Sequence, residues 1–322
     1  MEQVAFGRTG LTVGVAGLGC GGFSRLGLSA GGTEAQAIAL VHEAIDLGVT
    51  LIDTAAAYGT EAVVGRALAK MARDRVVIAT KASATAGQFI TDDVLASLEN
   101  SLRLLGTDCI DIFQLHAVAP AQYEAVRRDV VPALLRARAQ GKFRFLGITE
   151  TSPRDHHQAM LHRALAETVD GAPLWQSAMF AFHMLHQVAR EQVLPMTRAH
   201  GIGTLLMFVV RGIFASPARL APAIADLAAR DLVPAELARR DNALDFLIHD
   251  LGANSLTDAA YRYARHEPGT DVVLFGTGSA AHLRANIASI NAPPLPAADR
   301  ALLARLFSHL RGVGLEIPPA PP

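Results

Sequence analysis

The sequence predicts a single (β/α)₈ barrel, the TIM-barrel class of α/β fold, as one domain over residues 1–322. Short runs of Val, Ile and Leu alternate with segments of helical spacing. The runs have no polar alternation, which is typical of buried parallel strands. This alternation continues along nearly the whole chain, and no Pro- or Ser-rich linker divides it. The pattern therefore favours one closed barrel over a doubly wound sheet with a second domain.

The composition is that of a chain with a large core, since 51% of the residues are hydrophobic and 18% are charged. A formal net charge of −1 offers no basic field for nucleic acid, so a small-molecule ligand fits better. Two cysteines, Cys20 and Cys109, indicate a reducing compartment rather than a disulfide framework. The sequence shows neither a signal peptide nor the roughly 20-residue apolar run that a membrane helix needs. We expect a cytoplasmic protein with no membrane or nucleic-acid partner, and the sequence leaves its oligomeric state open.

The N-terminal segment predicts a hairpin followed by a glycine-rich loop. Two short apolar runs flank the Thr9-Gly10 turn, and we expect this hairpin to close one end of the core. The glycines of residues 17–22 match the dinucleotide-binding fingerprint, which must open a helix at once. Further glycines in residues 27–32 keep the chain irregular here, so we interpret the match as a loop after the first strand and not as a Rossmann turn.

The remaining elements follow in regular order. A capping box, Thr33 to Gln36, opens a helix that ends at Gly48, and Ser152-Pro153 predicts another helix start with serine as the cap. The connection between Arg211 and Leu256 is long enough to be a functional loop. Strands are predicted at residues 49–53, 76–81, 110–116, 143–148, 174–182, 202–210 and 271–275. Helices are predicted at residues 61–73, 92–105, 122–140 and 299–310, and residues 312–322 are expected to be disordered.

Polar side chains stand where three successive predicted strands end. Asp53 ends the second strand, and Tyr58 follows it in the loop. Lys81 ends the third strand and His116 the fourth. Because parallel strands present their carboxyl ends at one rim, these side chains should meet there, where α/β barrels keep their chemistry.

The sequence resembles the aldo-keto reductase family over nearly its whole length. The resemblance implies a catalytic tetrad of Asp53, Tyr58, Lys81 and His116. The motifs that carry it are Arg8-Thr-Gly-Leu, Ile52-Asp53-Thr-Ala-Ala-Ala-Tyr58-Gly, Ala79-Thr-Lys81 and Gln114-Leu-His116.

The chemistry of carbonyl reduction is consistent with those four roles. Hydride addition to a carbonyl carbon leaves negative charge on oxygen, and a nearby acid must deliver a proton. Tyr58 is the candidate acid, and the ammonium of Lys81 is expected to lower the tyrosine pKa from its usual value of about 10. Asp53 would hold Lys81 in place and keep its ammonium charged, while His116 would orient the substrate oxygen.

Other interpretations of the polar residues are weaker. An acid at a strand end is often a helix cap, and lone tyrosines or half-buried histidines are common, so the joint placement carries the assignment. We expect no metal site, because there is no H-E-x-x-H motif and no matching Cys/His cluster. Serine hydrolysis is disfavoured because no serine lies in a G-x-S-x-G elbow. The histidines considered for a metal are His156, His157, His183, His186 and His249.

The nicotinamide end of the expected cofactor site departs from the family pattern. Thr149 and Glu150 stand where the family has Ser-Asn, and an ionised Glu150 can only accept hydrogen bonds. Aligning residues 182–187 with the family's Tyr-Asn-Leu-Leu-x-Gln makes Phe182 the ring under the nicotinamide and puts Met179 in place of the carboxamide-binding glutamine. The alternative, in which Gln176 is that glutamine, leaves no aromatic residue at the stacking position.

The phosphate-binding end departs as well. Residues 208–211 replace the usual Ser-Pro-Leu, which leaves Arg211 and backbone amides for the pyrophosphate. After the eighth strand, His282 stands where several relatives have arginine, and Arg284 lies on another helix face. A neutral histidine is a weak phosphate partner, so we predict a modest preference for NADPH over NADH, less than about 100-fold. The residues expected to contact the cofactor are Gly21, Gly22, Thr149, Glu150, Met179, Phe182, Phe208, Arg211, Gly276, Thr277, Gly278, His282 and Asn286.

The resemblance thus implies an NAD(P)H-dependent oxidoreductase that reduces an aldehyde or ketone, or oxidises a sugar-like alcohol in the reverse direction. NADP(H) is favoured as the cofactor, and NAD(H) stays possible. The alternative is a cofactor-binding regulatory or redox-sensing subunit with little turnover, because such members of the family retain the tetrad.

Overall fold

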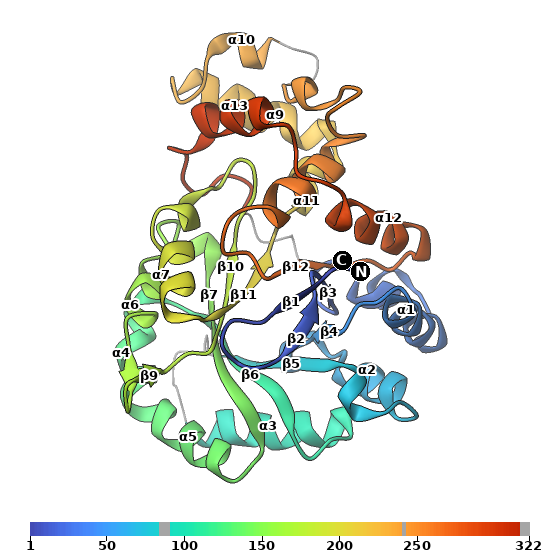
Figure 1. The fold of residues 1–322 in the computed structure, drawn as a ribbon, viewed down its shortest axis with the longest axis vertical. Coiled ribbons are helices and arrows are strands. Elements are labelled where there is room, and N and C mark those ends of the chain that lie inside the picture. Colours follow the sequence, from blue (N-terminus) through green and yellow to red (C-terminus); the bar gives the residue numbers. More distant parts are fainter. Residues whose placement is uncertain (84–90, 240–242, 316–322) are drawn as a thin grey trace.

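A closed barrel of parallel strands forms the centre of the computed structural model, which describes residues 1–83, 91–239 and 243–315. The strands follow the chain around the barrel, so each one pairs with its neighbours in sequence order and the last returns to the first (Figure 1). This arrangement confirms the predicted (β/α)₈ fold. The barrel strands are β3 (Ala16–Gly19), β4 (Leu51–Asp53), β5 (Val77–Ser83), β6 (Ile110–Val118), β7 (Phe143–Glu150), β10 (Ser177–Ala181), β11 (Gly203–Met207) and β12 (Val272–Phe275).

Helices surround the barrel and fill the connections between its strands. The α-helices are α1 (Glu34–Asp46), α2 (Glu61–Leu68), α3 (Thr91–Leu105), α4 (Tyr123–Ala125), α5 (Val131–Ala139), α6 (Ala159–Ala164), α7 (Val193–His200), α8 (Arg211–Ala215), α9 (Pro217–Ala229), α10 (Ala235–Ala238), α11 (Leu256–Arg265), α12 (Ala280–Asn291) and α13 (Ala297–Phe307). Short 3₁₀ turns are η1 (Arg25–Ala30), η2 (Ala56–Tyr58), η3 (Arg73–Arg75), η4 (Pro120–Gln122), η6 (Ser152–Arg154), η7 (Val188–Arg190) and η8 (Asp245–Leu247), and η5 (Val126–Val130) is a π-helical turn. A small hairpin, β8 (Thr168–Val169) with β9 (Ala172–Pro173), precedes β10.

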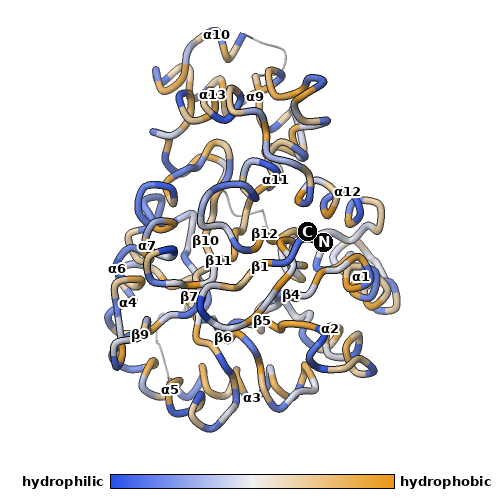
Figure 2. Tube along the Cα trace, in the orientation of Figure 1, coloured by the Kyte–Doolittle hydropathy of each residue, from blue (hydrophilic) through white to orange (hydrophobic). Residues whose placement is uncertain are grey.

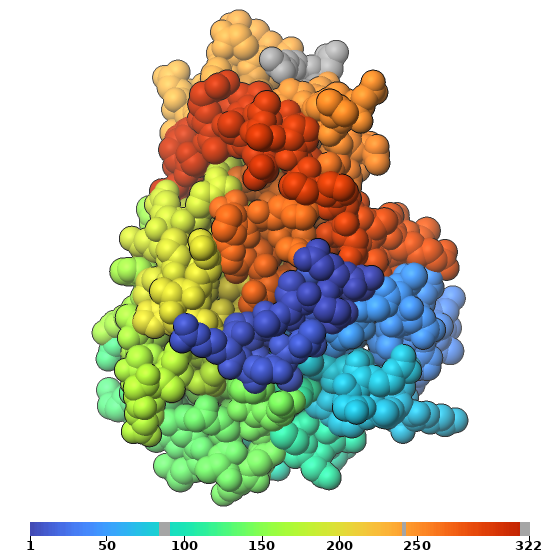
Figure 3. All heavy atoms as spheres, in the orientation of Figure 1, coloured from blue at the N-terminus to red at the C-terminus, as the bar shows by residue number. Residues whose placement is uncertain are grey.

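The predicted N-terminal hairpin closes the amino-terminal end of the barrel. Strands β1 (Gln3–Ala5) and β2 (Thr12–Gly14) pair antiparallel, and the hairpin lies across the face of the barrel seen in Figure 3. Phe6 is fully buried and packs with side chains of the barrel interior, including Leu51 and Leu205. Gly203 makes room for this ring, since a Cβ there would lie 2.4 Å from it. The chemistry is therefore left to the opposite, carboxyl-terminal rim.

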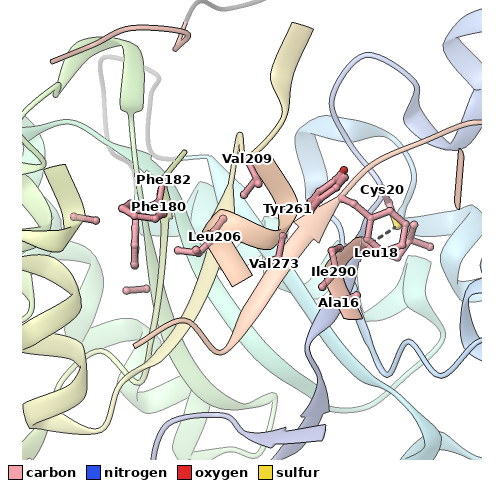
Figure 4. Close-up of a cluster of buried hydrophobic side chains, with 14 of the residues drawn as sticks. Ala16, Leu18, Cys20, Phe180, Phe182, Leu206, Val209, Tyr261, Val273 and Ile290 are labelled. Carbon is pink, nitrogen blue, oxygen red and sulfur yellow. Dashed lines mark hydrogen bonds between the residues drawn. The ribbon is translucent and has the colours of Figure 1, made fainter. Parts of the chain in front are cut away.

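The larger part of the core lies between the strands and the helices around them. Leu206 and Val273 point outward from β11 and β12 and meet Tyr261 of α11 in one cluster of buried side chains (Figure 4). The hydropathy colouring of the trace likewise shows apolar residues concentrated along the barrel strands (Figure 2). Strands that are apolar on both faces explain why their sequences run without alternation.

The long connection after β11 is mostly helical. It contains α8, α9 and α10, which lie with α13 in a group beyond the barrel (Figure 1). Nε2 of His309 lies 2.6 Å from the carbonyl oxygen of Leu232, which ties the end of α13 to this connection. Among the described residues, no helix is long and apolar enough to cross a membrane.

Several local predictions need correction. Ser152 is not a helix cap, because its hydroxyl donates to Glu150 at 3.0 Å and α6 begins only after Gln158. The predicted helix over residues 122–140 contains the π-helical turn η5 just before Pro132, whose missing N–H interrupts the regular helical hydrogen bonds. Disorder was expected over residues 312–322, but the side chain of Leu315 is buried in the structure. Residues 316–322 lie outside the described residues.

Candidate active site

Three adjacent strands bring the predicted tetrad together at the carboxyl-terminal rim. Asp53 is the last residue of β4, Lys81 lies on β5 beside it, and His116 lies near the end of β6. Tyr58 ends the 3₁₀ turn η2, which directly follows β4. The predicted juxtaposition of the four side chains is thus present in the structure.

Lys81 and Asp53 form a fully buried ion pair at the base of the site. The ammonium nitrogen of Lys81 donates to both carboxylate oxygens of Asp53, at 2.7 and 2.8 Å, and to the carbonyl oxygen of Thr54 at 2.7 Å. All three ammonium donors can therefore be satisfied without water. Nζ also lies 5.0 Å from the centre of the Tyr58 ring, so its position relative to that ring is fixed by the ion pair.

A strained bulge aims His116 at Tyr58. The pairing of β6 with β7 shifts register between Leu115 and Val118, and Ala117 has a left-handed φ of 56°. Such a conformation costs a non-glycine residue about 1 kcal/mol or more, so surrounding contacts must hold it. The amide of Ala117 donates to the hydroxyl oxygen of Thr149 at 2.6 Å, which supplies one such contact.

Hydrogen bonds hold the loop that carries Tyr58 on both sides of that residue. The hydroxyls of Thr54 and Thr60 lie 2.9 Å apart, and the hydroxyl of Thr80 donates to the buried carboxylate of Glu61 at 2.6 Å. The ring of Tyr58 itself lies against Gly21, where an added Cβ would come within 2.5 Å of it. The cofactor contact expected of Gly21 stays a prediction, and its missing side chain also makes room for the Tyr58 ring.

The pKa of Tyr58 corrects one expectation. Burial raises this pKa above its usual value. The charge of Lys81 acts in the opposite direction but is outweighed by burial, so the net pKa is raised. Asp53, which neutralises Lys81, adds to the rise. For Lys81, burial acts to lower the pKa, but the adjacent Asp53 outweighs burial and the pKa is raised. At neutral pH the site therefore holds a protonated phenol above a charged ammonium.

Two other titratable groups lie beside the tetrad. Burial and, to a smaller extent, the charge of Lys81 lower the pKa of His116 to about 3, so its imidazole is neutral. Cys20 is fully buried next to Asp53, and burial raises the pKa of its thiol well above the usual value. A neutral buried thiol is a poor nucleophile, which does not favour thiol-based redox sensing at this position.

A pocket of about 680 Å³ lies beside the barrel, between the loop after β3, helix α1 and the loop that leads into α12. It contains three of the predicted cofactor residues, Thr277, Gly278 and His282. The full lining is Ser24, Leu26, Gly27, Ala30, Gly32, Gln36, Ala39, Leu40, Glu43, Thr277, Gly278, Ser279, Ala280 and His282.

The N-terminus of α12 opens into this pocket. Ser279 caps the helix by accepting from the amide of His282 at 3.4 Å, and Thr277 accepts from the amide of Ser279 at 3.0 Å. The first turn of a helix favours an anion. The backbone of Gly278 lies against that of Gly27, since a Cβ on Gly278 would come within 2.5 Å of the Gly27 Cα atom. Polar backbone groups and small residues of this kind fit the adenosine-phosphate end of a dinucleotide.

The residues predicted under the nicotinamide do not lie at the rim as expected. Phe182 is fully buried and stacks on Tyr263 of α11, with ring centres 5.7 Å apart, and Figure 4 shows it among the buried side chains outside the barrel. Met179 points into the barrel and packs in the cluster that the N-terminal hairpin closes. Both side chains are buried, Met179 inside the barrel and Phe182 on its outer side.

Glu150 is also engaged within the protein. Its Oε1 atom accepts from the amide of Ala181, from Ser152 and from Gln158, at 2.5, 3.0 and 3.3 Å, while Oε2 is buried without a partner among the described residues. Burial raises the pKa of this carboxyl to about 8. Glu150 is therefore a neutral acid at neutral pH, and not the ionised acceptor that the sequence led us to expect.

The remaining candidates line the rim near β11 and β12. Phe208 has a left-handed φ of 64°, and the guanidinium of Arg211 lies 3.7 Å from the centre of its ring. Gly22 also has positive φ, and Gly276 is close to the backbone of β3, where a Cβ would lie 3.2 Å from the carbonyl oxygen of Gly19. Asn286 is on α12, outside the lining of the pocket described above.

Comparison with known proteins supports the family assignment. The family model described as the aldo/keto reductase family matches residues 17–306. The chain belongs to the aldo/keto reductase family. A curated relative, the aldo-keto reductase YhdN of Bacillus subtilis, is 29% identical over 307 residues, which cover 88% of this chain and 87% of that protein. Aldo/keto reductases are NAD(P)-dependent oxidoreductases.

Solved aldo/keto reductases have the same fold. The holo form of AKR11C1 from Bacillus halodurans superimposes with a TM-score of 0.71 at 22% identity, covering 98% of this chain and all of that one. An aldo/keto reductase from Klebsiella pneumoniae, solved with NADP and acetate, gives a TM-score of 0.68 at 24% identity and covers 95% of both chains.

Sequence reasoning about this aldo/keto reductase missed several supporting residues. Thr54 contributes its carbonyl oxygen to Lys81, a role that any residue type could fill and that leaves no sequence signal. Glu61 and Thr80 brace the Tyr58 loop, and an acid directly after that loop was the only available hint. The contact between Gly21 and the Tyr58 ring depends on tertiary packing, so the glycine alone could not reveal it.

Proposed function

We propose that this chain is an NAD(P)H-dependent reductase of an aldehyde or ketone, with Tyr58 as the general acid, and that it can oxidise an alcohol in reverse. The observation that carries the proposal is the buried pair of Lys81 and Asp53 directly beneath Tyr58, with His116 beside the phenol. A fully buried ion pair is costly to build.

The four side chains divide the work of reduction. The bound dinucleotide supplies a hydride. Tyr58 gives its phenolic proton to the carbonyl oxygen as charge develops there, and the ammonium of Lys81 stabilises the phenolate that remains. Asp53 keeps Lys81 charged and in place. His116 is neutral and half-buried, so it orients the substrate oxygen by a hydrogen bond without contributing charge.

The raised pKa of Tyr58 favours reduction over oxidation at neutral pH. A general acid must carry its proton, and burial keeps Tyr58 protonated well beyond neutrality. Oxidation needs the phenolate as a base, which forms only at alkaline pH. We therefore propose that the reductive direction dominates under ordinary conditions.

We propose NADP(H) as the preferred cofactor, with NAD(H) as a second possibility. Support comes from the pocket at the N-terminus of α12 and from the Klebsiella pneumoniae relative, which was solved with NADP. The residues that would hold the adenosine phosphate are Thr277, Gly278 and His282. Arg211, whose guanidinium lies 3.7 Å from the centre of the Phe208 ring, would hold the pyrophosphate. The two free cysteines are consistent with a reducing compartment, and we propose a cytoplasmic location.

A nucleotide-binding protein with little turnover is the second candidate. The observation that favours it is the placement of Phe182 and Met179, because neither faces the rim where a nicotinamide ring would have to lie. In that case the tetrad would be intact but the hydride donor would be poorly positioned.

One experiment distinguishes the two candidates. Oxidation of NADPH by the purified protein is followed by absorbance with a panel of aldehydes and ketones, and NADP⁺ affinity is measured by calorimetry on the same preparation. Turnover with any carbonyl of the panel supports the reductase. Tight nucleotide binding without turnover supports the second candidate, and the absence of both contradicts each of them.

A further inference from the structure

One charged group in the lining of the pocket beside α12, the carboxylate of Glu43, opposes the binding of a phosphate. Among the described residues that line it there is no lysine or arginine, and Glu43 is the only carboxylate. Glu43 lies on α1, on the wall that faces the loop into α12. A phosphate here would gain the helix amides and the hydroxyl of Thr277, but it would also meet the charge of Glu43.

Glu43 binds the guanidinium of Arg284, a residue of α12. Nε of Arg284 lies 2.6 Å from Oε1 of Glu43 in an ion pair, which connects α12 to α1 at the edge of the pocket. The side chain of Arg284 is 62% exposed and long enough to change direction if its partner is removed. Glu43, at 27% exposure, is the better anchored member of the pair.

The two nicotinamide dinucleotides differ only in the phosphate on the adenosine ribose 2′ position. A guanidinium is the preferred partner for such a phosphate, because it can donate two parallel hydrogen bonds. While Arg284 is bound to Glu43, that partner is occupied. A free ribose 2′-hydroxyl has the opposite preference, because it can donate to a carboxylate.

We propose that Glu43 weakens the preference of this protein for NADP(H), by holding Arg284 away from a ribose 2′-phosphate. The proposal rests on the proposed function, because it requires the adenosine end of the dinucleotide to bind in this pocket. Glu43 then acts as a specificity-determining residue that favours NAD(H) relative to NADP(H), against the preference that the helix N-terminus gives. The tetrad takes no part in this discrimination.

The test is the affinity for NADP⁺ and NAD⁺, measured by calorimetry at fixed ionic strength. In Glu43→Gln we expect NADP⁺ to bind at least about fivefold more tightly than in the wild type, because Arg284 becomes available, while NAD⁺ binds no more tightly. Glu34→Gln is the matched control. It removes the same charge from the same helix, but Glu34 pairs with Arg66 of α2 and does not line the pocket, so it should leave the affinity ratio unchanged.

A double variant shows whether Arg284 is responsible. In Glu43→Gln/Arg284→Gln, the gain in NADP⁺ affinity should disappear. An unchanged ratio in Glu43→Gln, an equal gain in Glu34→Gln, or a gain that persists in the double variant would each overturn the proposal while leaving the reductase assignment intact. Failure of the wild-type protein to bind either dinucleotide would instead overturn the proposed function, and this inference with it.

Discussion

The hydroxyl oxygen of Tyr58 lies 3.5 Å from Nε2 of His116, and the two rings meet nearly perpendicular to each other. Because the imidazole is neutral, it can share a hydrogen bond at this position but has no acidic proton to give at neutral pH. Lys81 keeps its protons in the ion pair with Asp53. Of the three side chains around the expected carbonyl position, only Tyr58 can act as the proton donor.

Removing that donor should abolish most of the activity. We expect Tyr58→Phe to lower kcat by at least about 10²-fold, the lower range of what general acid catalysis contributes, with NADP⁺ affinity nearly unchanged. Tyr123→Phe is a suitable control, because it removes another buried tyrosine hydroxyl, which is bound to Glu167 and Trp175 and not to the tetrad. Steady-state kinetics and calorimetry provide the measurement. Wild-type turnover in Tyr58→Phe would refute the assignment.

The charge of Lys81 should be visible in the pH dependence of alcohol oxidation. Oxidation needs the Tyr58 phenolate, so its rate rises with pH toward the tyrosine pKa. Burial raises that pKa and Lys81 opposes the rise, so Lys81→Met should move the alkaline limb to still higher pH. If the folded Lys81→Met protein has the same pH–rate profile as the wild type, Lys81 has only a structural role.

The control for that variant follows from the ion pair. Lys81→Met alone strands a buried carboxylate on Asp53, which typically destabilises a protein by about 3 to 5 kcal/mol. Asp53→Asn added to Lys81→Met removes the stranded charge and should recover more than half of the lost unfolding free energy, measured by urea denaturation. The pH profile of the double variant then reports on Tyr58 in a stably folded protein.

The packing of Gly21 predicts an effect on catalysis without an effect on binding. In Gly21→Ala the new methyl group would lie 2.5 Å from the Tyr58 ring, so the ring must move. We expect kcat to fall by about tenfold or more, since small misplacements of a catalytic group are costly, while the nucleotide Kd stays within about twofold. Gly22→Ala serves for comparison, because its Cβ would meet nothing within 4 Å, although its positive φ adds some strain. A weakened Kd with unchanged kcat would contradict this expectation and support a cofactor contact for Gly21.

The sequence was most informative where a local pattern dictates a local structure. Apolar runs fixed the barrel strands, and the capping box at Thr33 fixed the start of α1, where both reciprocal hydrogen bonds are present. The tetrad could be predicted because parallel strands align their carboxyl ends, which turns positions such as Lys81 and His116 into neighbours. No contact between distant segments had to be known in advance.

The prediction was weaker where side-chain direction or burial decides the outcome. Phe182 follows β10 and continues its outward-facing side, and its ring stacks on Tyr263 of α11, which lies 81 positions further along the chain (263 − 182). The sign of the Tyr58 pKa shift depended on how much water the folded loop excludes, which the proximity of Lys81 alone did not reveal. Glu150 illustrates both points, because its direction and its protonation follow from contacts with Ala181 and Gln158.

Glu150 should make the stability of the protein depend on pH. Burial raises its folded pKa to about 8 from an ordinary value of 4.5, so its stabilising contribution is fully present below pH 4.5 and is lost as pH rises through 8. Glu150→Gln keeps an oxygen for the amide of Ala181 but cannot ionise. The unfolding free energy of the variant minus that of the wild type should be larger at pH 8.5 than at pH 5. The expected change is a few kcal/mol, since each pKa unit corresponds to about 1.4 kcal/mol.

The measurement is urea denaturation of both proteins across this pH range. Glu167→Gln is the control, because it changes a partly exposed glutamate whose carboxylate is bound by Arg127. A stability difference between wild type and Glu150→Gln that does not change with pH would show that Glu150 is ionised in the folded protein.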